Sequence, residues 1–415
     1  MKRVSVLLAV SIALVACRDS LEPTQLRPVA SPPRFAQASN LTVTDLGSLI
    51  ADWSNAVGVN NASQIIGQSG SHSFLWQSGA MTDIGTLGGS WAVAVALSEQ
   101  GHVVGYGPTS RMTDSGVVDG NADAFLWHGG TMTPLATLGG SGSAALAVNS
   151  DGQVVGNSWT LAGELRAVRW HNGTITTLGS LGGRFSTAQA INASGHIVGK
   201  STLPLVETDT GGFAEGPEHA FLWQNGVMID LGTLGGSWSD AYLINDSDQV
   251  VGSSATAEGL SHAFMWQNGV MIDLGTLGGN WTVATAMNDV GQVVGFSTTA
   301  DGSFHAFLWE NGAISDLGTL GGAGSYARAI NNLGQVVGTA DVSSETVHAF
   351  LWHEGVMTDL GTNGGFGSEA TDVNDEGQIV GYNYAAGGGR ALLWTPSLDR
   401  SKDKKTKKPK KPHKK

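Results

Sequence analysis

Residues 219–252 read HAFLWQNGVMIDLGTLGGSWSDAYLINDSDQVVG, and variants of this stretch recur along most of the chain. The tryptophan of its FLW element stands at Trp76, Trp127, Trp170, Trp223, Trp266, Trp309, Trp352 and Trp394. The spacings between successive tryptophans are 51, 43, 53, 43, 43, 43 and 42 residues. A fixed period of this size is the signature of a repeat architecture. The repeat therefore decides the fold.

Each repeat contains four segments with the character of short β-strands. The first is small and alternating, as in 239–245, and an Asn-x-x-Gly turn such as 331–334 leads to the second, as in 335–338. The third is the His-Ala-Phe-Leu-Trp segment, and the fourth is the Asp-Leu-Gly segment that follows it. A two-residue turn, most often Asn-Gly as at Asn225-Gly226, joins these two. Asn-Gly between apolar runs is typical of a type I′ hairpin.

The count of segments predicts how the chain closes. Second, third and fourth strands each occur eight times, but the ordered part begins with an isolated fourth strand, Leu41 to Gly47, and ends with an isolated third strand, Arg390 to Trp394. Each would be an unpaired edge in an open array. We therefore predict an all-β fold, an eight-bladed β-propeller of four-stranded blades over residues 41–396, in which the N-terminal strand completes the last blade.

The order of motifs, HAFLW, DLGTLGG, AIN and GQVVG, resembles the HAF-repeat family of probable extracellular repeat proteins. His-Ala-Phe itself is present at His219, His262, His305 and His348. The resemblance covers Leu41 to Trp394 and implies an exported repeat protein. It brings no activity, substrate or catalytic residues with it.

The two ends of the chain differ from the repeats. Residues 1–17 have a basic start, a short apolar core and the ending Leu-Val-Ala-Cys, which is typical of a lipoprotein signal peptide with lipidation at Cys17. A signal cleaved near Ala38 is the alternative. Residues 18–40 are expected to be a disordered linker, and 397–415 a disordered lysine-rich tail. Cys17 is the only cysteine, so an intramolecular disulfide is excluded.

Five histidines precede an aspartate by eleven residues: His72 and Asp83, His219 and Asp230, His262 and Asp273, His305 and Asp316, His348 and Asp359. In the expected hairpin each pair lies diagonally across neighbouring strands on one face. Arg390 and Asp45 would form the equivalent pair across the ring closure. We interpret all six as structural pairs and expect no metal site, because one pair per blade does not converge on one point.

Aromatic residues next to the crossing loops are the candidates for ligand binding. They are Trp53, Trp91, Phe185, Trp238, Trp281 and Phe366. Together with insertion carboxylates such as Asp119 and Glu215, they would suit stacking on sugar rings. The alternative is that these rings pack between blades.

No catalytic signature of the common types is present, and no cofactor is expected. The net charge is −13 although the tail 401–415 contributes +8, so the rest of the chain is strongly acidic and nucleic acid is not an expected partner. We predict a monomeric, non-catalytic binding or scaffold module at the bacterial cell envelope or surface, held at the membrane by the lipid, with a glycan or anionic surface polymer as partner. A polysaccharide hydrolase or lyase with loop-borne carboxylates is the alternative, and a purely structural role is the third possibility.

Overall fold

The computed structural model describes residues 36–37, 41–50, 53–113, 116–208 and 212–396. Contacts divide the chain into two units, 1–32 and 33–415, and all described residues belong to the second. The expected signal peptide with Cys17, most of the expected linker and the lysine-rich tail lie outside the described residues. The described part contains strands and no helix, and hence no helix long and apolar enough to cross a membrane.

The strands fall into antiparallel groups of four that follow the repeats. The first four groups contain β3 (Ser54–Val59), β4 (Ile65–Ser69), β5 (His72–Gln77) and β6 (Ala80–Asp83); β7 (Val93–Leu97), β8 (Val103–Thr113), β9 (Gly116–His128) and β10 (Thr131–Pro134); β11 (Gly139–Val148), β12 (Val154–Thr160), β13 (Leu165–His171) and β14 (Thr174–Gly179); and β15 (Ser186–Ile191), β16 (Ile197–Thr202), β19 (Glu218–Gln224) and β20 (Val227–Asp230).

The later groups repeat this order. They contain β21 (Gly235–Ile244), β22 (Val250–Thr256), β23 (Ser261–Gln267) and β24 (Val270–Asp273); β25 (Gly278–Met287), β26 (Val293–Thr299), β27 (Phe304–Glu310) and β28 (Ala313–Asp316); β29 (Ser325–Ile330), β30 (Val336–Asp341), β31 (Val347–His353) and β32 (Val356–Asp359); and β33 (Gly367–Val373), β34 (Ile379–Tyr384) and β35 (Arg390–Pro396), completed by β2 (Leu41–Asp45). One parallel pair, Ser261 with Trp281, links β23 to β25.

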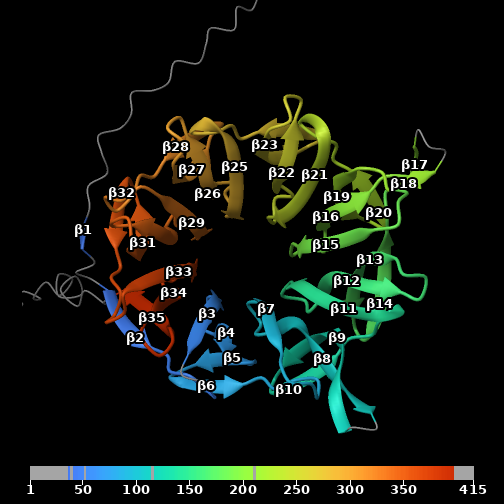
Figure 1. Ribbon diagram of the computed structural model, residues 1–415, viewed down its shortest axis with the longest axis horizontal. Helices are drawn as coiled ribbons and strands as arrows, with labels where there is room; N and C mark the ends of the chain where they lie inside the picture. Colours follow the sequence, from blue (N-terminus) through green and yellow to red (C-terminus); the bar gives the residue numbers. More distant parts are fainter. Residues whose placement is uncertain (1–35, 38–40, 51–52, 114–115, 209–211, 397–415) are drawn as a thin grey trace, which may run out of the picture. The chain divides into compact units, whose positions relative to one another are not determined.

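The first and last segments of the described chain lie side by side. β2 pairs antiparallel with β35, with Val43 opposite Trp394, and Figure 1 shows these two strands together. The neighbouring β33 hydrogen-bonds to β3, because Thr371 Oγ1 donates to the carbonyl of Ala56 at 2.9 Å. The fourth strand missing from the last repeat is therefore supplied by residues that precede the first repeat.

Two short pairings lie outside the repeat. β1 (Ala36–Gln37) pairs in parallel with β32, although these two residues fall within the expected disordered linker. The free edge of β32, the outermost strand of its group, explains the difference, since an unpaired edge accepts any extended segment. In the insertion after β16, β17 (Val206–Glu207) pairs with β18 (Phe213–Ala214).

The core lies between neighbouring groups. One buried cluster combines Val155 and Leu178 of one group with Ile197, Phe221 and Trp223 of the next. The phenylalanine of the HAF or equivalent element is completely buried at six positions: Phe74, Phe125, Phe221, Phe264, Phe307 and Phe350. Burying one such side chain stabilises the fold by roughly 2–3 kcal/mol. Five of the strand tryptophans are buried in the same kind of cluster: Trp127, Trp170, Trp223, Trp309 and Trp394.

We call the first strand of each repeat, such as β21, its inner strand. Each inner strand carries a β-bulge that the sequence analysis did not predict. In β21 the register shifts between Ala241 and Leu243. The bulge brings the carbonyl of Asp240 over Gly252, where an added Cβ would lie 2.0 Å from that oxygen. The glycine that ends each Val-Val-Gly segment is therefore required by close backbone approach.

Candidate functional site

The inner strands have two ends with different chemistry. We call one the loop end, because the loops that cross from one repeat to the next reach it; the six predicted binding aromatics lie there, immediately before or within the first residues of an inner strand. We call the other the turn end, where the Asn-x-x-Gly turns such as 288–291 connect inner strands to second strands.

At the loop end, exposure separates the six aromatics. Trp53 is 40% exposed, Trp238 and Trp281 are each 37% exposed, and Phe366 is 68% exposed. Trp91 and Phe185 are partly buried. The rings come from six different groups of strands, and no ring contact between two of the six is found among the described residues.

Several of these rings pack against other aromatics. Trp91 contacts Tyr106 edge-on, with ring centroids 6.0 Å apart. Trp281 meets Phe304 edge-on at 5.5 Å, and Phe304 in turn stacks on Tyr326 at 6.1 Å. Trp281 is thus both packed against another ring and partly exposed, whereas most of the Phe366 side chain is exposed to solvent.

The five histidine–aspartate pairs make the hydrogen bonds expected from the hairpin register. In the middle repeats, Phe221 lies opposite Asp230, and His219 Nδ1 is 3.0 Å from the Asp230 carboxylate. The corresponding distances to the nearer carboxylate oxygen are 2.7 Å for His72 and Asp83, 2.8 Å for His262 and Asp273, 2.8 Å for His305 and Asp316, and 2.9 Å for His348 and Asp359. Each aspartate also accepts from a backbone N–H two residues later, as Asp230 does from Gly232 at 2.8 Å.

The sixth expected pair is not formed. Arg390 Nη1 donates to Ser48 Oγ at 2.8 Å, while Asp45 Oδ1 accepts from the backbone of Gly47 at 2.8 Å. The arginine side chain is longer than histidine and reaches past the diagonal position to the loop behind β2. The prediction of an Arg390–Asp45 ion pair was therefore wrong.

The turn end contains a polar network that the sequence analysis treated only as turn chemistry. Asn331 Nδ2 donates to Gln335 Oε1 at 2.7 Å and to the backbone carbonyl of Asn374 in the next group at 2.8 Å. The same inter-group bond recurs from Asn60, Asn149, Asn192, Asn245, Asn288 and Asn374. We call these seven residues the asparagine series. Their regular spacing in the sequence was the signal that could have revealed them.

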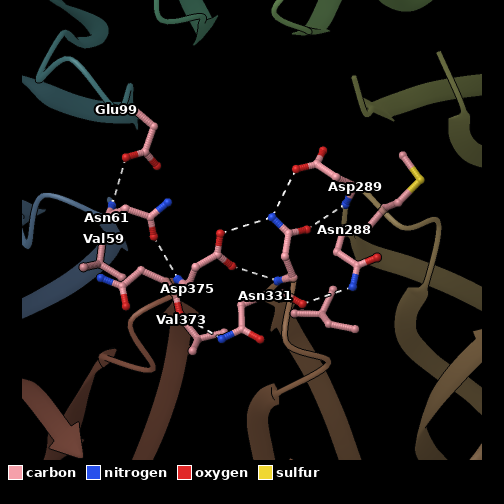
Figure 2. A pocket seen from close by; sticks show the side chains of 12 residues that line it. Val59, Asn61, Glu99, Asn288, Asp289, Asn331, Val373 and Asp375 are labelled. Atoms are coloured by element: carbon pink, nitrogen blue, oxygen red, sulfur yellow. Dashed lines mark hydrogen bonds between the residues drawn. The ribbon is translucent and has the colours of Figure 1, made fainter. Parts of the chain in front are cut away.

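A hollow of about 310 Å³ opens beside part of the asparagine series. Figure 2 shows its wall, where the side chains of Asn61, Asp375 and Asp289 are joined by hydrogen bonds to neighbouring residues. Asp375 N donates to Asn61 Oδ1 at 2.8 Å, and Asn61 N donates to Glu99 Oε2 at 3.0 Å. Backbone and side-chain groups thus form a continuous polar rim.

Two carboxylates in this hollow share one donor. Asn332 Nδ2 lies 3.1 Å from Asp289 Oδ2 and 3.1 Å from Asp375 Oδ2. Because both distances are to the same nitrogen, the two carboxylate oxygens are no further apart than the sum of these distances. Within the described residues no group of three or more histidines, cysteines, aspartates and glutamates is arranged to hold a metal ion.

The insertion carboxylates have local partners. Glu215 forms an ion pair with Arg184 at 2.5 Å, and Asp119 accepts from the backbone of Ser90 at 2.8 Å. Arg184 also lies over the ring of Phe185 at 5.8 Å. The insertions thus contact the aromatic positions of the loop end.

No protein-family model matches the chain, and neither does any curated protein. Solved structures similar to it include the β-propeller domain of the Trilobed protease from Pyrococcus furiosus, at 10% identity and a TM-score of 0.47, covering 77% of this chain and 99% of that one. TolB from Acinetobacter baumannii is 12% identical with a TM-score of 0.35, over 63% and 65% of the two chains. A gluconolactonase from Xanthomonas campestris is 13% identical with a TM-score of 0.32, over 74% and 98%.

Proposed function

We propose that this chain is an exported, lipid-anchored repeat protein of the HAF-repeat type that binds glycans or surface polymers at its loop end without catalysing a reaction. The observation that carries the proposal is the repeated placement of exposed aromatic rings at that end, at Trp53, Trp238, Trp281 and Phe366. Aromatic faces offer large, rigid surfaces that suit stacking on sugar rings. Rings at one position of successive repeats would contact successive sugars of a polymer.

The scaffold we propose is a closed eight-bladed β-propeller. Its support is the pairing of β2 with β35 and the hydrogen bond from Asn374 Nδ2 to the Asn60 carbonyl at 2.9 Å. Closure would leave no unpaired edge at the junction of the two chain ends. It would also hold the loop-end aromatics in fixed relative positions.

A direct binding measurement tests the function. The full chain would be applied to a glycan array and compared with Phe366→Ala, Trp238→Ala and Trp281→Ala. Phe213→Ala is the matched control, because Phe213 is 72% exposed but lies on β18 in an insertion. We expect weaker binding in the first three variants and unchanged binding in the control. Unchanged binding in all four variants, or loss only when residues 401–415 are removed, contradicts the loop-end site.

The second candidate is a polysaccharide hydrolase or lyase that uses the carboxylates of the hollow. The proximity of Asp289 and Asp375, both bonded to Asn332 Nδ2 at 3.1 Å, favours it, since glycosidases use two carboxyl groups about 5–10 Å apart. Both groups are, however, already held by amide donors of the rim. Release of reducing ends from a polysaccharide, abolished by Asp289→Asn and Asp375→Asn, would establish this candidate and reject the non-catalytic one.

The anchor is tested separately from the binding site. Cys17→Ser should abolish incorporation of labelled fatty acid and release the protein from the membrane fraction. If the variant stays in that fraction with unchanged labelling, Cys17 does not carry the lipid.

A further inference from the structure

One cluster at the loop end differs from its counterparts in all other repeats. It contains Arg328 on β29, Glu369 on β33, Tyr382 and Tyr384 on β34, and Phe366 just before β33. Glu369 lies opposite Tyr382 in the β33–β34 register. Tyr384 is two residues further along the same strand and so shares the face with Tyr382.

The tyrosines and the glutamate form a connected hydrogen-bonding surface. The Tyr384 hydroxyl donates to Glu369 Oε1, and its ring meets Tyr382 edge-on at 5.4 Å. Burial is the main reason that the pKa of the Tyr384 hydroxyl is raised, and the hydrogen bond to Glu369 is the second. The hydroxyl therefore stays protonated and remains a donor. Phe366 stacks on Tyr384 with 18° between the ring planes and 6.2 Å between centroids.

Arg328 retains free binding capacity. Its side chain is 46% exposed, and its Nη2 forms an ion pair with Glu369 Oε2 at 3.9 Å, a distance too long for a hydrogen bond. No hydrogen bond from this guanidinium is found among the described residues. Five N–H donors are therefore available, in the planar geometry that matches a carboxylate.

The position of Arg328 argues against a purely structural role. It is the extra residue at the bulge of β29, between Ala327 and Ala329. The corresponding bulge residues of the other inner strands are Val57, Val95, Leu146, Gln189, Tyr242, Thr285 and Thr371. None of them is charged, so the scaffold forms without a cation at this place.

We propose that the cluster is a subsite for an acidic sugar, with the sugar carboxylate on Arg328 and the sugar ring against Phe366. Phe366 is 68% exposed and supplies the apolar face. Tyr384 stacks on Phe366 and in turn contacts Tyr382 and Glu369, so these three side chains are the partners for sugar hydroxyls. This inference rests on the proposed glycan-binding function and specifies its ligand as a uronic acid or another carboxylated sugar.

The test compares oligogalacturonate with its methyl ester, using the full chain in both cases. The methyl ester keeps the sugar ring and removes the negative charge. We expect tighter binding of the free acid, and about tenfold weaker binding of it by Arg328→Gln, because a charge-assisted hydrogen-bonded pair is lost. Phe366→Ala should weaken binding of both ligands.

Arg169→Gln is the control, because it removes the same charge from a side chain on β13 that packs over Trp223 and not over a loop-end aromatic. It should leave the affinity for oligogalacturonate unchanged. Equal weakening by Arg328→Gln and Arg169→Gln would mean that net charge alone attracts the polyanion, and the subsite would be rejected. Thermal unfolding of each variant shows that the comparison involves folded protein.

The same measurement separates this inference from the proposed function. Binding of neutral glycans that depends on Phe366, with no preference for the free acid, overturns the acidic subsite and leaves glycan binding in place. Absence of binding to both oligogalacturonate and a panel of neutral glycans overturns both.

Discussion

The side-chain amide of Asn374 donates to the backbone carbonyl of Asn60 at 2.9 Å, across 314 residues of sequence. The same donor also bonds Gln378 Oε1 at 2.8 Å. Residues at opposite ends of the repeat array are thus joined by the bond that elsewhere joins consecutive repeats, for example Asn245 to Asn288.

This equivalence makes a prediction about stability. Asn374→Ala and Asn245→Ala should each lower the free energy of unfolding by about 2 kcal/mol, because each leaves buried polar partners unsatisfied. Urea unfolding of both variants measures the two losses. A much smaller loss for Asn374→Ala than for Asn245→Ala would show that the contact between the chain ends contributes little in solution.

The glycine at the end of a second strand should tolerate no side chain. Gly252→Ala places a Cβ 2.0 Å from the Asp240 carbonyl oxygen, and we expect a loss of more than about 3 kcal/mol or failure to fold. Gly212→Ala is the control, because its Cβ would meet its nearest atom, Thr208 Oγ1, at an ordinary 3.4 Å. Equal thermal midpoints for the two variants would contradict the close approach described for the bulge.

Asp372 should make stability depend on pH. Its Oδ2 accepts a hydrogen bond from the Val59 backbone N–H at 2.9 Å, which joins β33 to β3. Burial raises the pKa of Asp372 from 3.8 to about 6. Because the folded protein holds this proton more tightly than the unfolded chain, stability falls by about 3 kcal/mol as pH rises from about 4 to about 6, and it is constant above that range.

The control for Asp372 is a variant that cannot ionise. Asp372→Asn should flatten this part of the pH profile, measured by urea unfolding between pH 4 and pH 7.5. If wild type and Asp372→Asn show the same slope, other groups cause the pH dependence.

His305 contributes a pH dependence of the same sign as that of Asp372, at higher pH. Its pKa is raised above 6.5, first of all by the hydrogen bond to Asp316. The pair therefore stabilises the fold below the unfolded pKa of His305, and this contribution is lost as pH rises through the folded pKa. Asp316→Asn should lower the pKa of His305, as followed by NMR titration of the imidazole.

Asp301→Asn is the matched control for His305. Asp301 acts on His305 only through its charge and less strongly than Asp316. The expected change in the pKa of His305 is therefore smaller. A larger effect of Asp301→Asn would show that the Asp316 hydrogen bond is not the main cause.

Local sequence patterns were sufficient to predict the hairpins and their side-chain pairs. Asn268 and Gly269 have φ of 53° and 85°, as the type I′ turn requires. That turn sets the register in which Phe264 faces Asp273 and His262 reaches the same carboxylate. Turn type, register and diagonal pairing all follow from residues within one hairpin.

Features that depend on neighbouring repeats were missed. The amide bond from Asn331 to Asn374 arises where the turn ends of neighbouring groups approach each other. Arg390 failed as a prediction for a similar reason, since its partner Ser48 lies in a loop whose position depends on the pairing of β2 with β35. The residues within a single repeat do not indicate these contacts, and for the asparagine series the signal is the recurrence of the residue from one repeat to the next.

The pairing of β2 with β35 also has a consequence for biosynthesis. Leu41–Asp45 leave the ribosome early, but their partner Arg390–Pro396 is the last strand of the described chain to be made. Until β35 has been made, β2 has no strand to pair with, and β34 has a free edge. The strand pair that joins the two ends of the repeat region can therefore form only after all the repeats have been synthesised.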